Sequence, residues 1–453
     1  AENAPPDDVS RYRRAAAEQL LVSGHINEGL TLLGECMNAV GEQFPANTPG
    51  ARRWLIANMV WLRIRGTRHR ERLPNTGDAG DRVRLDLYRT ASLGLSLVDP
   101  LRGALCQARA LRTALRLGDR QRIGYALAYH AMYSAAAGDP HITYARSLVA
   151  QSRQIAEAHR SSFLLGWARA SEGVVEYFAG RFELAVDVLV DAESQLRDHI
   201  AGAVPELNHL RLFVLFSLRR HGDFDRLRGH YLDYVRDAIR RGDRYALTSF
   251  RASANSVWLA ADDSARAHDE LAAIQWSPAA EGLHLQHWFI ARARAELALY
   301  DNDPDALTRA KDSLTLFLST PFAHVEVVRA ETALELARIA IVQGDLPGAR
   351  EALTRLRRER APYLRAMTLL LEAGADALQG RDDEARAHLQ EASALAEAAG
   401  MHTLCALARR RNGEILAGDL GARIIVDADA VLHRHGVTKP TSFARAFAPW
   451  PTR

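Results

Sequence analysis

Lysine and cysteine are scarce in this sequence of 453 residues. The lysines are Lys311 and Lys439, and the cysteines are Cys36, Cys106 and Cys405. An odd and widely spaced set of cysteines argues against a disulfide framework and favours a reducing, cytoplasmic setting. We expect all three to be buried and to behave as small apolar side chains.

The shortage of lysine excludes two kinds of phosphate chemistry. A P-loop needs a lysine that follows a glycine and precedes serine or threonine, and a protein kinase needs a strand lysine with two further motifs. Lys311 stands in RAKD and Lys439 in TKP, so neither fits. Gly-x-Ser-x-Gly and His-Glu-x-x-His motifs are missing as well. We therefore expect no enzymatic activity and no cofactor.

Long apolar runs and a strong net charge are missing too. No stretch approaches the roughly 18 unbroken apolar residues of a membrane span. The first residues, AENAPP, lack the basic start of a signal peptide, and the chain begins without Met, as a fragment of a longer protein would. The formal net charge is +3, which gives no general reason to expect nucleic acid as a partner.

The sequence is rich in helix-forming residues and contains turn-forming residue pairs at regular intervals. Ala, Leu and Arg dominate. Turn-forming pairs recur every 36 to 42 residues, at 138–139, 180–181, 222–223, 262–263, 302–303, 344–345, 380–381 and 418–419. Glycine tolerates the left-handed conformation that ends a helix, and Asp caps the next one. Each interval therefore holds two amphipathic helices joined by a turn.

The clearest repeat unit lies at residues 163–200. Gly173, Gly180, Phe182, Ala185 and Ala192 match the spacing of a tetratricopeptide (TPR) motif. We therefore predict an all-α fold, a right-handed α-solenoid of about ten TPR-like antiparallel helix pairs. Residues 1–100 are expected to form helical repeats interrupted by loops at 43–50 and 73–81. Residues 101–437 form regular repeats that end in a helix at 420–437, and 438–453 form an irregular tail.

Several short stretches together resemble one protein family. They are RRAAAEQLL at 13–21, SGH at 23–25, VDPLRGA at 98–104, GDRYA at 242–246, WLAADD at 258–263 and LHLQHW at 283–288. Their order and spacing resemble the C-terminal helical region of large bacterial serine/threonine kinases. In that family a kinase domain and a STAND-type ATPase precede TPR-like repeats. The resemblance implies a regulatory, signal-sensing role, and it carries over no catalytic residue.

A binding surface is expected on the concave face, which the first helix of each pair lines. Its candidate residues are Tyr125, Tyr129, Trp167, Tyr177, His209, Arg251, Asn255 and Arg292. Aromatic and Arg side chains are preferred anchors for protein partners. The alternative for each aromatic residue is a place in the core between repeats.

Two other groups of residues invite a functional interpretation. His284 and His287 share a helix face with Glu281 one turn earlier, but a metal site needs more ligands, so we favour capping and inter-helix hydrogen bonds. A basic segment could bind phosphate or nucleic acid, although a solvated face or a docking face for the ATPase is favoured. It contains Arg63, Arg65, Arg68, Arg70 and Arg72, with Trp54 and Trp61.

The sequence thus favours a non-catalytic scaffold that binds a protein or peptide and regulates the kinase and ATPase domains of its parent chain. The main alternative is a receptor domain for a small molecule, which a closed apolar cavity of several hundred cubic ångströms would favour. A nucleic-acid-binding repeat would need a continuous basic stripe, and a stand-alone enzyme would need a cluster of catalytic groups.

Overall fold

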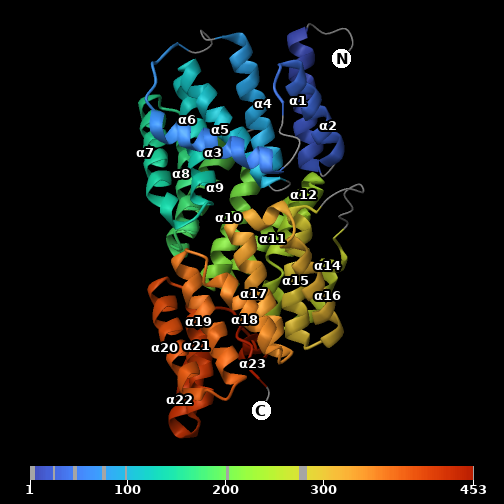
Figure 1. Cartoon of the computed structure of the whole chain (residues 1–453), viewed down its shortest axis with the longest axis vertical. Coiled ribbons are helices and arrows are strands. Elements are labelled where there is room, and N and C mark those ends of the chain that lie inside the picture. Colours follow the sequence, from blue (N-terminus) through green and yellow to red (C-terminus); the bar gives the residue numbers. More distant parts are fainter. Residues whose placement is uncertain are drawn as a thin grey trace.

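The chain is a series of helix pairs (Figure 1). The computed structural model describes residues 6–23, 26–43, 48–73, 78–96, 99–199, 204–274 and 283–451. These residues form α-helices and two short 3-10 helices, and no strand occurs among them. The predicted all-α helical-repeat fold is confirmed, whereas the hand of the superhelix stays a prediction.

Neighbouring helices form antiparallel pairs in chain order. The first pairs are α1 (Pro6–Ser23) with α2 (Ile26–Ala39), α4 (Ala79–Leu95) with α5 (Pro100–Leu117), α6 (Arg120–Ala135) with α7 (Ile142–Ala158), α8 (Ser162–Phe178) with α9 (Phe182–His199), and α10 (Val204–His221) with α11 (Phe224–Arg241). Next, α12 (Arg244–Ser253) and α13 (Ser256–Ala260) precede α14 (Ser264–Ala272). The last pairs are α15 (Leu285–Asp301) with α16 (Pro304–Phe317), α17 (Glu326–Val342) with α18 (Leu346–Leu356), α19 (Pro362–Ala377) with α20 (Asp382–Ala398), and α21 (His402–Leu416) with α22 (Gly418–Arg434).

Each of the eight turn-forming pairs identified in the sequence lies where the two helices of a helix pair are joined. The first residue of every turn-forming pair has a positive φ, from 56° to 100°, at Gly138, Gly180, Gly222, Asp262, Asn302, Gly344, Gly380 and Gly418. Several of the following Asp residues cap the next helix; Asp223, for example, accepts a hydrogen bond from the Arg226 N–H at 3.0 Å. Local stop and start signals therefore set the repeat, as the sequence predicts.

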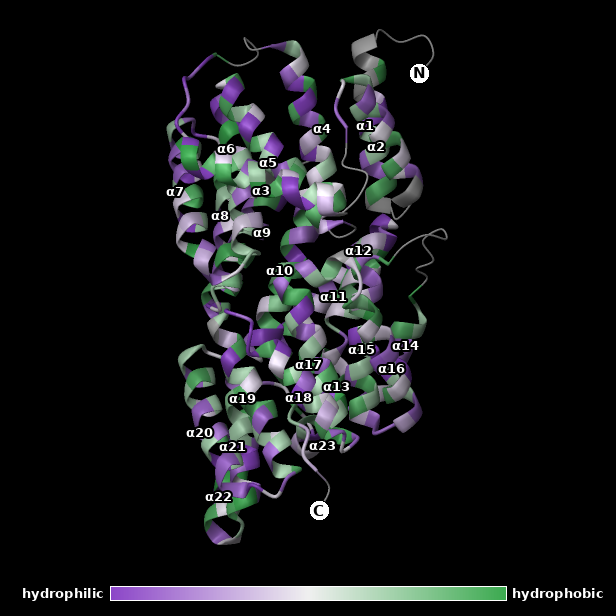
Figure 2. Cartoon of the chain, in the orientation of Figure 1, coloured by the Kyte–Doolittle hydropathy of each residue, from purple (hydrophilic) through white to green (hydrophobic). Residues whose placement is uncertain are grey.

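Small residues allow the paired helices to approach closely. A Cβ atom built on Gly173 of α8 would lie 2.5 Å from Leu189 Cγ of α9, so a larger residue would push the two helices apart. Phe182 is fully buried at the start of α9. Figure 2 shows that most helices carry both hydrophilic and hydrophobic residues along their length, which is the pattern of helices with one buried face.

The superhelix is wound so tightly that distant repeats contact each other. The Phe182 ring meets the Tyr363 ring edge-on, with 5.2 Å between centroids. The Phe224 N–H donates to the His435 carbonyl oxygen at 2.9 Å, and the Thr438 N–H donates to the Ala260 carbonyl oxygen at 2.7 Å. These contacts close the inner face of the solenoid against later repeats.

Two helices stand outside the pairs. Helix α3 (Thr48–Arg65) lies across the neighbouring helices in Figure 1 and packs against α5. Helix α23 (Pro440–Phe447) packs against α15. The short helices η1 (Asp139–His141) and η2 (Pro321–His324) precede α7 and α17.

The termini require corrections to the sequence interpretation. The irregular tail expected at 438–453 is wrong, because Pro440 opens α23 and Phe443 and Phe447 are buried on one helix face. Helix α22 begins at Gly418, so Asp419 lies in its first turn and is not its cap. The pair α4 and α5 spans residue 100, where the sequence interpretation divided the chain. Residues 44–47 and 74–77 of the two expected loops, and residues 24–25 and 98 of the family-like stretches, lie outside the described residues.

Candidate functional site

A cavity of about 450 Å³, partly open to solvent, lies on the inner face of the superhelix. Its walls come from α6, α8, α10, α15 and α17, each the first helix of its pair, together with α3, α5 and η2. The inner face is thus lined by first helices, as the repeat geometry predicts. A volume of several hundred cubic ångströms is typical of sites that bind small organic molecules.

The walls of the cavity are mainly apolar and aromatic. Phe213 and Phe216 of α10 contact each other at 5.6 Å between ring centroids, and Phe216 continues to Phe289 of α15 at 5.7 Å. Trp288 lies next to Phe289 at 5.4 Å. Such a wall favours the binding of an apolar molecule, because its burial removes apolar surface from water.

Helix α3 contributes one face to the cavity. Leu55, Ile56, Met59 and Val60 line it, and their spacing places them on the same side of the helix. Ile56 is 52% exposed and Val60 is 50% exposed. These apolar side chains therefore keep surface that a molecule bound in the cavity would cover.

Two consecutive residues of α6 line the cavity and carry buried polar atoms without a partner. Tyr129 is 3% exposed and His130 is 1% exposed, and both line the cavity. The Tyr129 hydroxyl and both ring nitrogens of His130 have no hydrogen-bond partner among the described residues. By contrast, the neighbouring Tyr133 hydroxyl donates to the Ser92 carbonyl oxygen at 2.9 Å. These atoms have almost no accessible surface, so a molecule in the cavity would not reach them without a rearrangement of α6.

Two histidines of the site, His130 and His209, are neutral at physiological pH. Burial lowers the pKa of His130 to about 4, and the Arg63 charge lowers it further in the same direction. Burial also lowers the pKa of His209 to about 4, against an opposing effect of Glu206. A neutral imidazole can both donate and accept a hydrogen bond.

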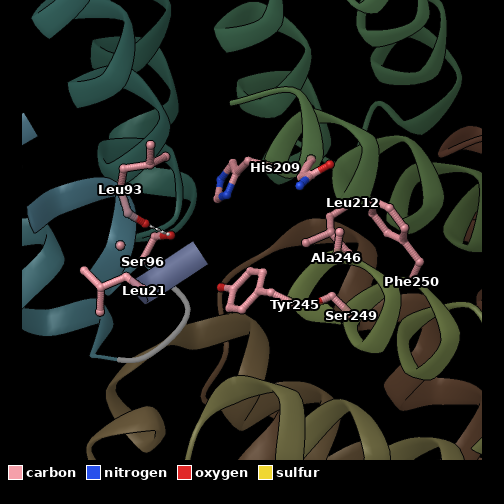
Figure 3. Close-up of a pocket in the computed structure, with 11 residues that line it drawn as sticks. Leu21, Leu93, Ser96, His209, Leu212, Tyr245, Ala246, Ser249 and Phe250 are labelled. Atoms are coloured by element: carbon pink, nitrogen blue, oxygen red, sulfur yellow. Dashed lines mark hydrogen bonds between the residues drawn. The ribbon is translucent and has the colours of Figure 1, made fainter. Parts of the chain in front are cut away.

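A smaller pocket of about 30 Å³ adjoins the cavity (Figure 3). The two share Ser96, His209 and Leu212 as lining residues. Figure 3 shows the His209 ring projecting from α10 toward the space between Ser96 and Tyr245. This pocket has room for water-sized molecules only, so ligand binding concerns the larger cavity.

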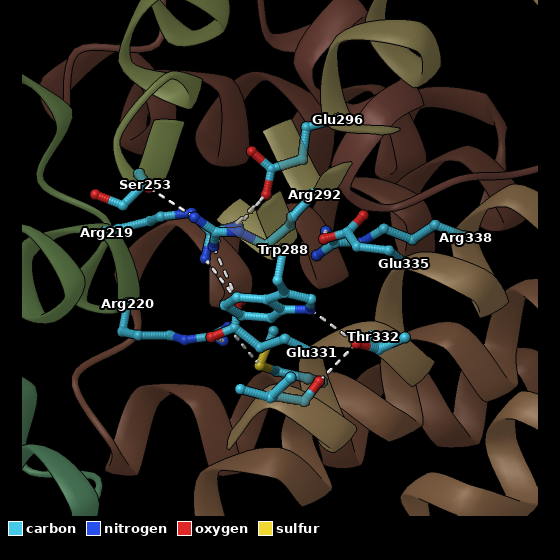
Figure 4. A network of polar contacts seen from close by, with 12 residues as sticks. Arg219, Arg220, Ser253, Trp288, Arg292, Glu296, Glu331, Thr332, Glu335 and Arg338 are labelled. Atoms are coloured by element: carbon cyan, nitrogen blue, oxygen red, sulfur yellow. Dashed lines mark hydrogen bonds and ion pairs between the residues drawn. The ribbon is translucent and has the colours of Figure 1, made fainter. Parts of the chain in front are cut away.

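A buried ion-pair network lies behind one wall of the cavity (Figure 4). Arg292 donates to Glu331 at 2.9 Å and to the Ser253 carbonyl oxygen at 2.7 Å. Glu331 also pairs with Arg220. Burial alone would raise the pKa of Glu331, but Arg220, Arg292 and Arg219 bring it down to about 2. Glu331 is therefore ionised, and the two charged residues that line the cavity, Arg292 and Glu331, neutralise each other.

The network contains more arginine than glutamate. The charged residues labelled in Figure 4 are Arg219, Arg220, Arg292 and Arg338 on one side and Glu296, Glu331 and Glu335 on the other. Arg219, Arg220 and Arg338 do not line the cavity. The excess of positive charge therefore lies in the protein interior, behind Arg292 and Glu331.

The structure brings half of the candidate binding residues together at the cavity. Tyr129, Tyr177, His209 and Arg292 line it. The others have structural contacts elsewhere. Tyr125 stacks on Trp167, which in turn stacks on Tyr129, with centroid distances of 5.5 and 5.2 Å.

The remaining two candidates lie on the far side of their helices. Arg251 pairs with Glu270 at 2.9 Å, and the Asn255 side-chain amide donates to the Ala267 carbonyl oxygen at 3.1 Å. Tyr125, Tyr129, Trp167 and Tyr177 are all buried. They do not form the exposed anchor surface that the sequence interpretation envisaged, because Tyr125, Tyr129 and Trp167 pack on one another in the core between α6 and α8, which is the alternative that the sequence left open.

Sequence reasoning missed the contribution of α3, of His130 and of Glu331. The apolar spacing of Leu55, Ile56, Met59 and Val60 is visible in the sequence, but it resembles that of any half-buried helix. The sequence does not predict that α3 and α17 line the same cavity, since no local signal indicates which distant repeats come together.

The other candidates have structural explanations. His284 and His287 form a capping box at the start of α15, with the His284 N–H donating to His287 Nδ1 at 2.9 Å, so the capping prediction is confirmed. Glu281 lies outside the described residues. Within the described part of the chain, no group of three metal-ligating side chains is assembled, and no helix is long and apolar enough to cross a membrane.

The basic segment is engaged in local contacts. The Arg63 guanidinium lies 4.0 Å from the centre of the Tyr144 ring, and Arg65 donates to the carbonyl oxygens of Gly66 and Arg68. The three cysteines are buried, as predicted.

No protein-family model and no curated protein matches the chain.

Proposed function

We propose that this chain is a non-catalytic sensor whose inner cavity binds a small, mainly apolar molecule. The observation that carries the proposal is the aromatic-walled cavity of about 450 Å³ on the inner face. Of the two functions that the sequence favours, the small-molecule receptor gains from this cavity. The protein-binding groove loses support, because six of its eight proposed anchors are buried.

Helix α3 supplies a route from the ligand to an output. One of its faces lines the cavity, and Trp54 and Ile64 on the same helix are exposed. A ligand would cover Ile56 and Val60 and thereby stabilise α3 in its present position. A partner that contacts α3 would then sense whether the cavity is occupied.

The family resemblance suggests what that partner is. In the multidomain kinases that the sequence resembles, the repeats regulate a STAND-type ATPase and a kinase domain. We propose the same arrangement here: a cytoplasmic regulatory region that acts on output domains of its parent chain. The ligand, in this proposal, changes the equilibrium between two positions of α3.

The test is saturable binding of a neutral apolar dye, Nile red, to the purified chain. We expect about one dye per chain, as for a single cavity of this size. Ala104 of α5 lines the cavity, so Ala104→Trp should obstruct it and weaken binding strongly. Ala394→Trp, on the exposed face of α20, is the matched control and should bind like the original chain. Equal binding by both variants, or binding that does not saturate, would refute the proposal.

A further inference from the structure

We infer that His221, His402 and His435 form a pH-sensitive switch, which opens a contact between distant repeats of the superhelix when the medium becomes mildly acidic. His221 ends α10, His402 begins α21, and His435 directly follows α22. The switch needs no ligand, so it is independent of the proposed receptor function.

The three histidines lie where the superhelix closes on itself. The turn that joins α10 to α11 contacts both ends of the last helix pair. The Phe224 N–H donates to the His435 carbonyl oxygen at 2.9 Å. A Cβ atom built on Gly222 would lie 2.1 Å from Thr403 Oγ1, so a side chain at this position would clash with α21. These contacts leave little room for the two segments to adjust while they stay together.

The three imidazole rings are in direct contact. The His221 ring meets the His402 ring edge-on at 4.6 Å between centroids, and the His402 ring stacks on the His435 ring at 4.7 Å. Neutral rings pack favourably in such arrangements, whereas two imidazolium ions at this separation repel each other. His402 contacts both other rings, so a charge on it and on either neighbour places like charges side by side across the closure.

The surroundings of the cluster favour its neutral form. Burial is the largest effect that lowers the pKa of His221 and of His435, and His402 lowers both further. The other groups that act on these two rings are Glu183, Asp223 and the Gly400 backbone, which favour the protonated form, and Arg434, which opposes it. Because the pKa values are lowered in the closed form, an open form binds protons more readily. Acid therefore favours opening, increasingly as the pH falls below the ordinary histidine value.

The burial of His221 adds to this effect. Its side chain is 5% exposed, and Nδ1 has no hydrogen-bond partner among the described residues. A proton bound to this nitrogen would find no acceptor in the closed form, whereas water would accept its hydrogen bond in the open form. His402 and His435 are only half-buried, so protons can reach the cluster from solvent.

Hydrogen exchange of the full chain, followed by mass spectrometry, tests the switch. Peptides that contain Phe224 and Thr438 report on the closure, because these N–H groups donate to His435 and Ala260 across it. A peptide that contains Leu165, whose N–H donates to Ser161 within one repeat, is the internal reference. Between pH 7.5 and pH 5, we expect protection at the closure to fall about tenfold relative to the unfolded chain at each pH, as repulsion between neighbouring like charges would give. Protection at Leu165 should change much less.

Three variants assign the effect to the cluster. His402→Phe keeps a ring between the other two but cannot bind a proton, so the loss of protection should shrink to about threefold or less. His435→Phe, measured in parallel, should act in the same direction. The control is His230→Phe, because burial lowers the pKa of His230 as well, but its ring contacts Tyr234 and not the cluster. This control should keep the full loss of protection at pH 5.

Four outcomes would overturn the switch. They are unchanged protection of Phe224 and Thr438 at pH 5, an equal loss of protection at Leu165, a full loss in both His402→Phe and His435→Phe, and an effect of His230→Phe as large as that of His402→Phe. The second outcome would show that acid unfolds the whole chain. The last would show that burial of any histidine in this region, without contact between rings, explains the pH dependence.

Discussion

Phe182 and Tyr363 meet edge-on, with 5.2 Å between ring centroids, although they belong to repeats far apart in the sequence. Phe182 also contacts Tyr177 of the cavity wall at 5.7 Å. This contact therefore connects the winding of the superhelix to the shape of the site. An open solenoid of the same pairs would present a groove, whereas the closed winding forms a cavity.

Replacing Phe182 by Ala should destabilise the chain strongly. The side chain is fully buried, and its removal leaves a cavity between two repeats. We expect a loss of about 3 to 5 kcal/mol in the free energy of unfolding. Urea unfolding measures it, with Leu184→Ala, a partly exposed position on the same helix, as the control. Equal effects of the two substitutions would contradict a structural role for the contact with Tyr363.

Replacing Glu331 by Gln should lower the free energy of unfolding, because it leaves buried arginines without a partner of opposite charge. The substitution keeps the shape of the side chain but leaves Arg220 and Arg292 without their shared carboxylate. We expect a loss of about 3 to 5 kcal/mol in unfolding free energy, as for a broken buried ion pair. Glu351→Gln removes an exposed pair with Arg355 and should change stability by about 0.5 kcal/mol or less. A loss for Glu331→Gln no larger than that of this control would show that the network is not stabilising.

Stability should fall as the pH falls below 6.5, partly because of His130. The pKa of this side chain is about 4 in the folded chain, against an ordinary value of 6.5. Between these two values the unfolded chain takes up a proton that the folded chain does not, so acid favours unfolding. For His130 the effect approaches about 3 kcal/mol at pH 4.

Urea titrations at a series of pH values measure this dependence. His130→Leu should make the decline in unfolding free energy between pH 6.5 and 4 less steep. Any loss of packing caused by the substitution appears separately, as a lower unfolding free energy at neutral pH. His159, which is exposed, provides the comparison: His159→Leu should leave the decline unchanged. If the unfolding free energy of His130→Leu declines as steeply as that of the original chain, His130 is not a source of the pH dependence.

Polar substitutions on α3 should weaken binding more than stability. Ile56 and Val60 are about half exposed, so Ile56→Ser with Val60→Ser should change the unfolding free energy by less than about 1 kcal/mol. The affinity for Nile red should fall, since a ligand in the cavity would bury both side chains. Ile64→Ser is the control, because Ile64 is exposed on the same helix and does not line the cavity. If neither variant changes the affinity, α3 does not contact the ligand.

The turns and the helix pairs could be predicted from the sequence because their causes are local. A glycine at positive φ, followed by an Asp cap, acts within a few residues. All eight turn-forming pairs have a positive φ at their first residue, and in four of them the second residue is an Asp that caps the next helix. The buried cysteines and the histidine cap of α15 follow from similarly local rules. The last residues were predicted to be irregular because the segment contains proline, whereas Pro440 occupies the first turn of α23.

The candidate site could be predicted only in part. Tyr129, Tyr177, His209 and Arg292 were identified because first helices face inward in stacked pairs. Tyr125 and Trp167 lie on the same helices, but they stack on each other and do not line the cavity. This difference depends on the direction of each side chain and on its neighbours in the adjacent helices. The approach of α3 to α17 depends on contacts between segments that are distant in sequence.

The sequence by itself determined that this protein is a series of amphipathic helix pairs, because apolar periodicity and helix caps act over short distances. Only the tertiary structure decided that the series closes on itself. The pitch of a superhelix accumulates from small rotations at each interface, and these depend on how side chains such as Leu189 fit against Gly173. That sum placed α3 and α17 in the walls of one aromatic cavity.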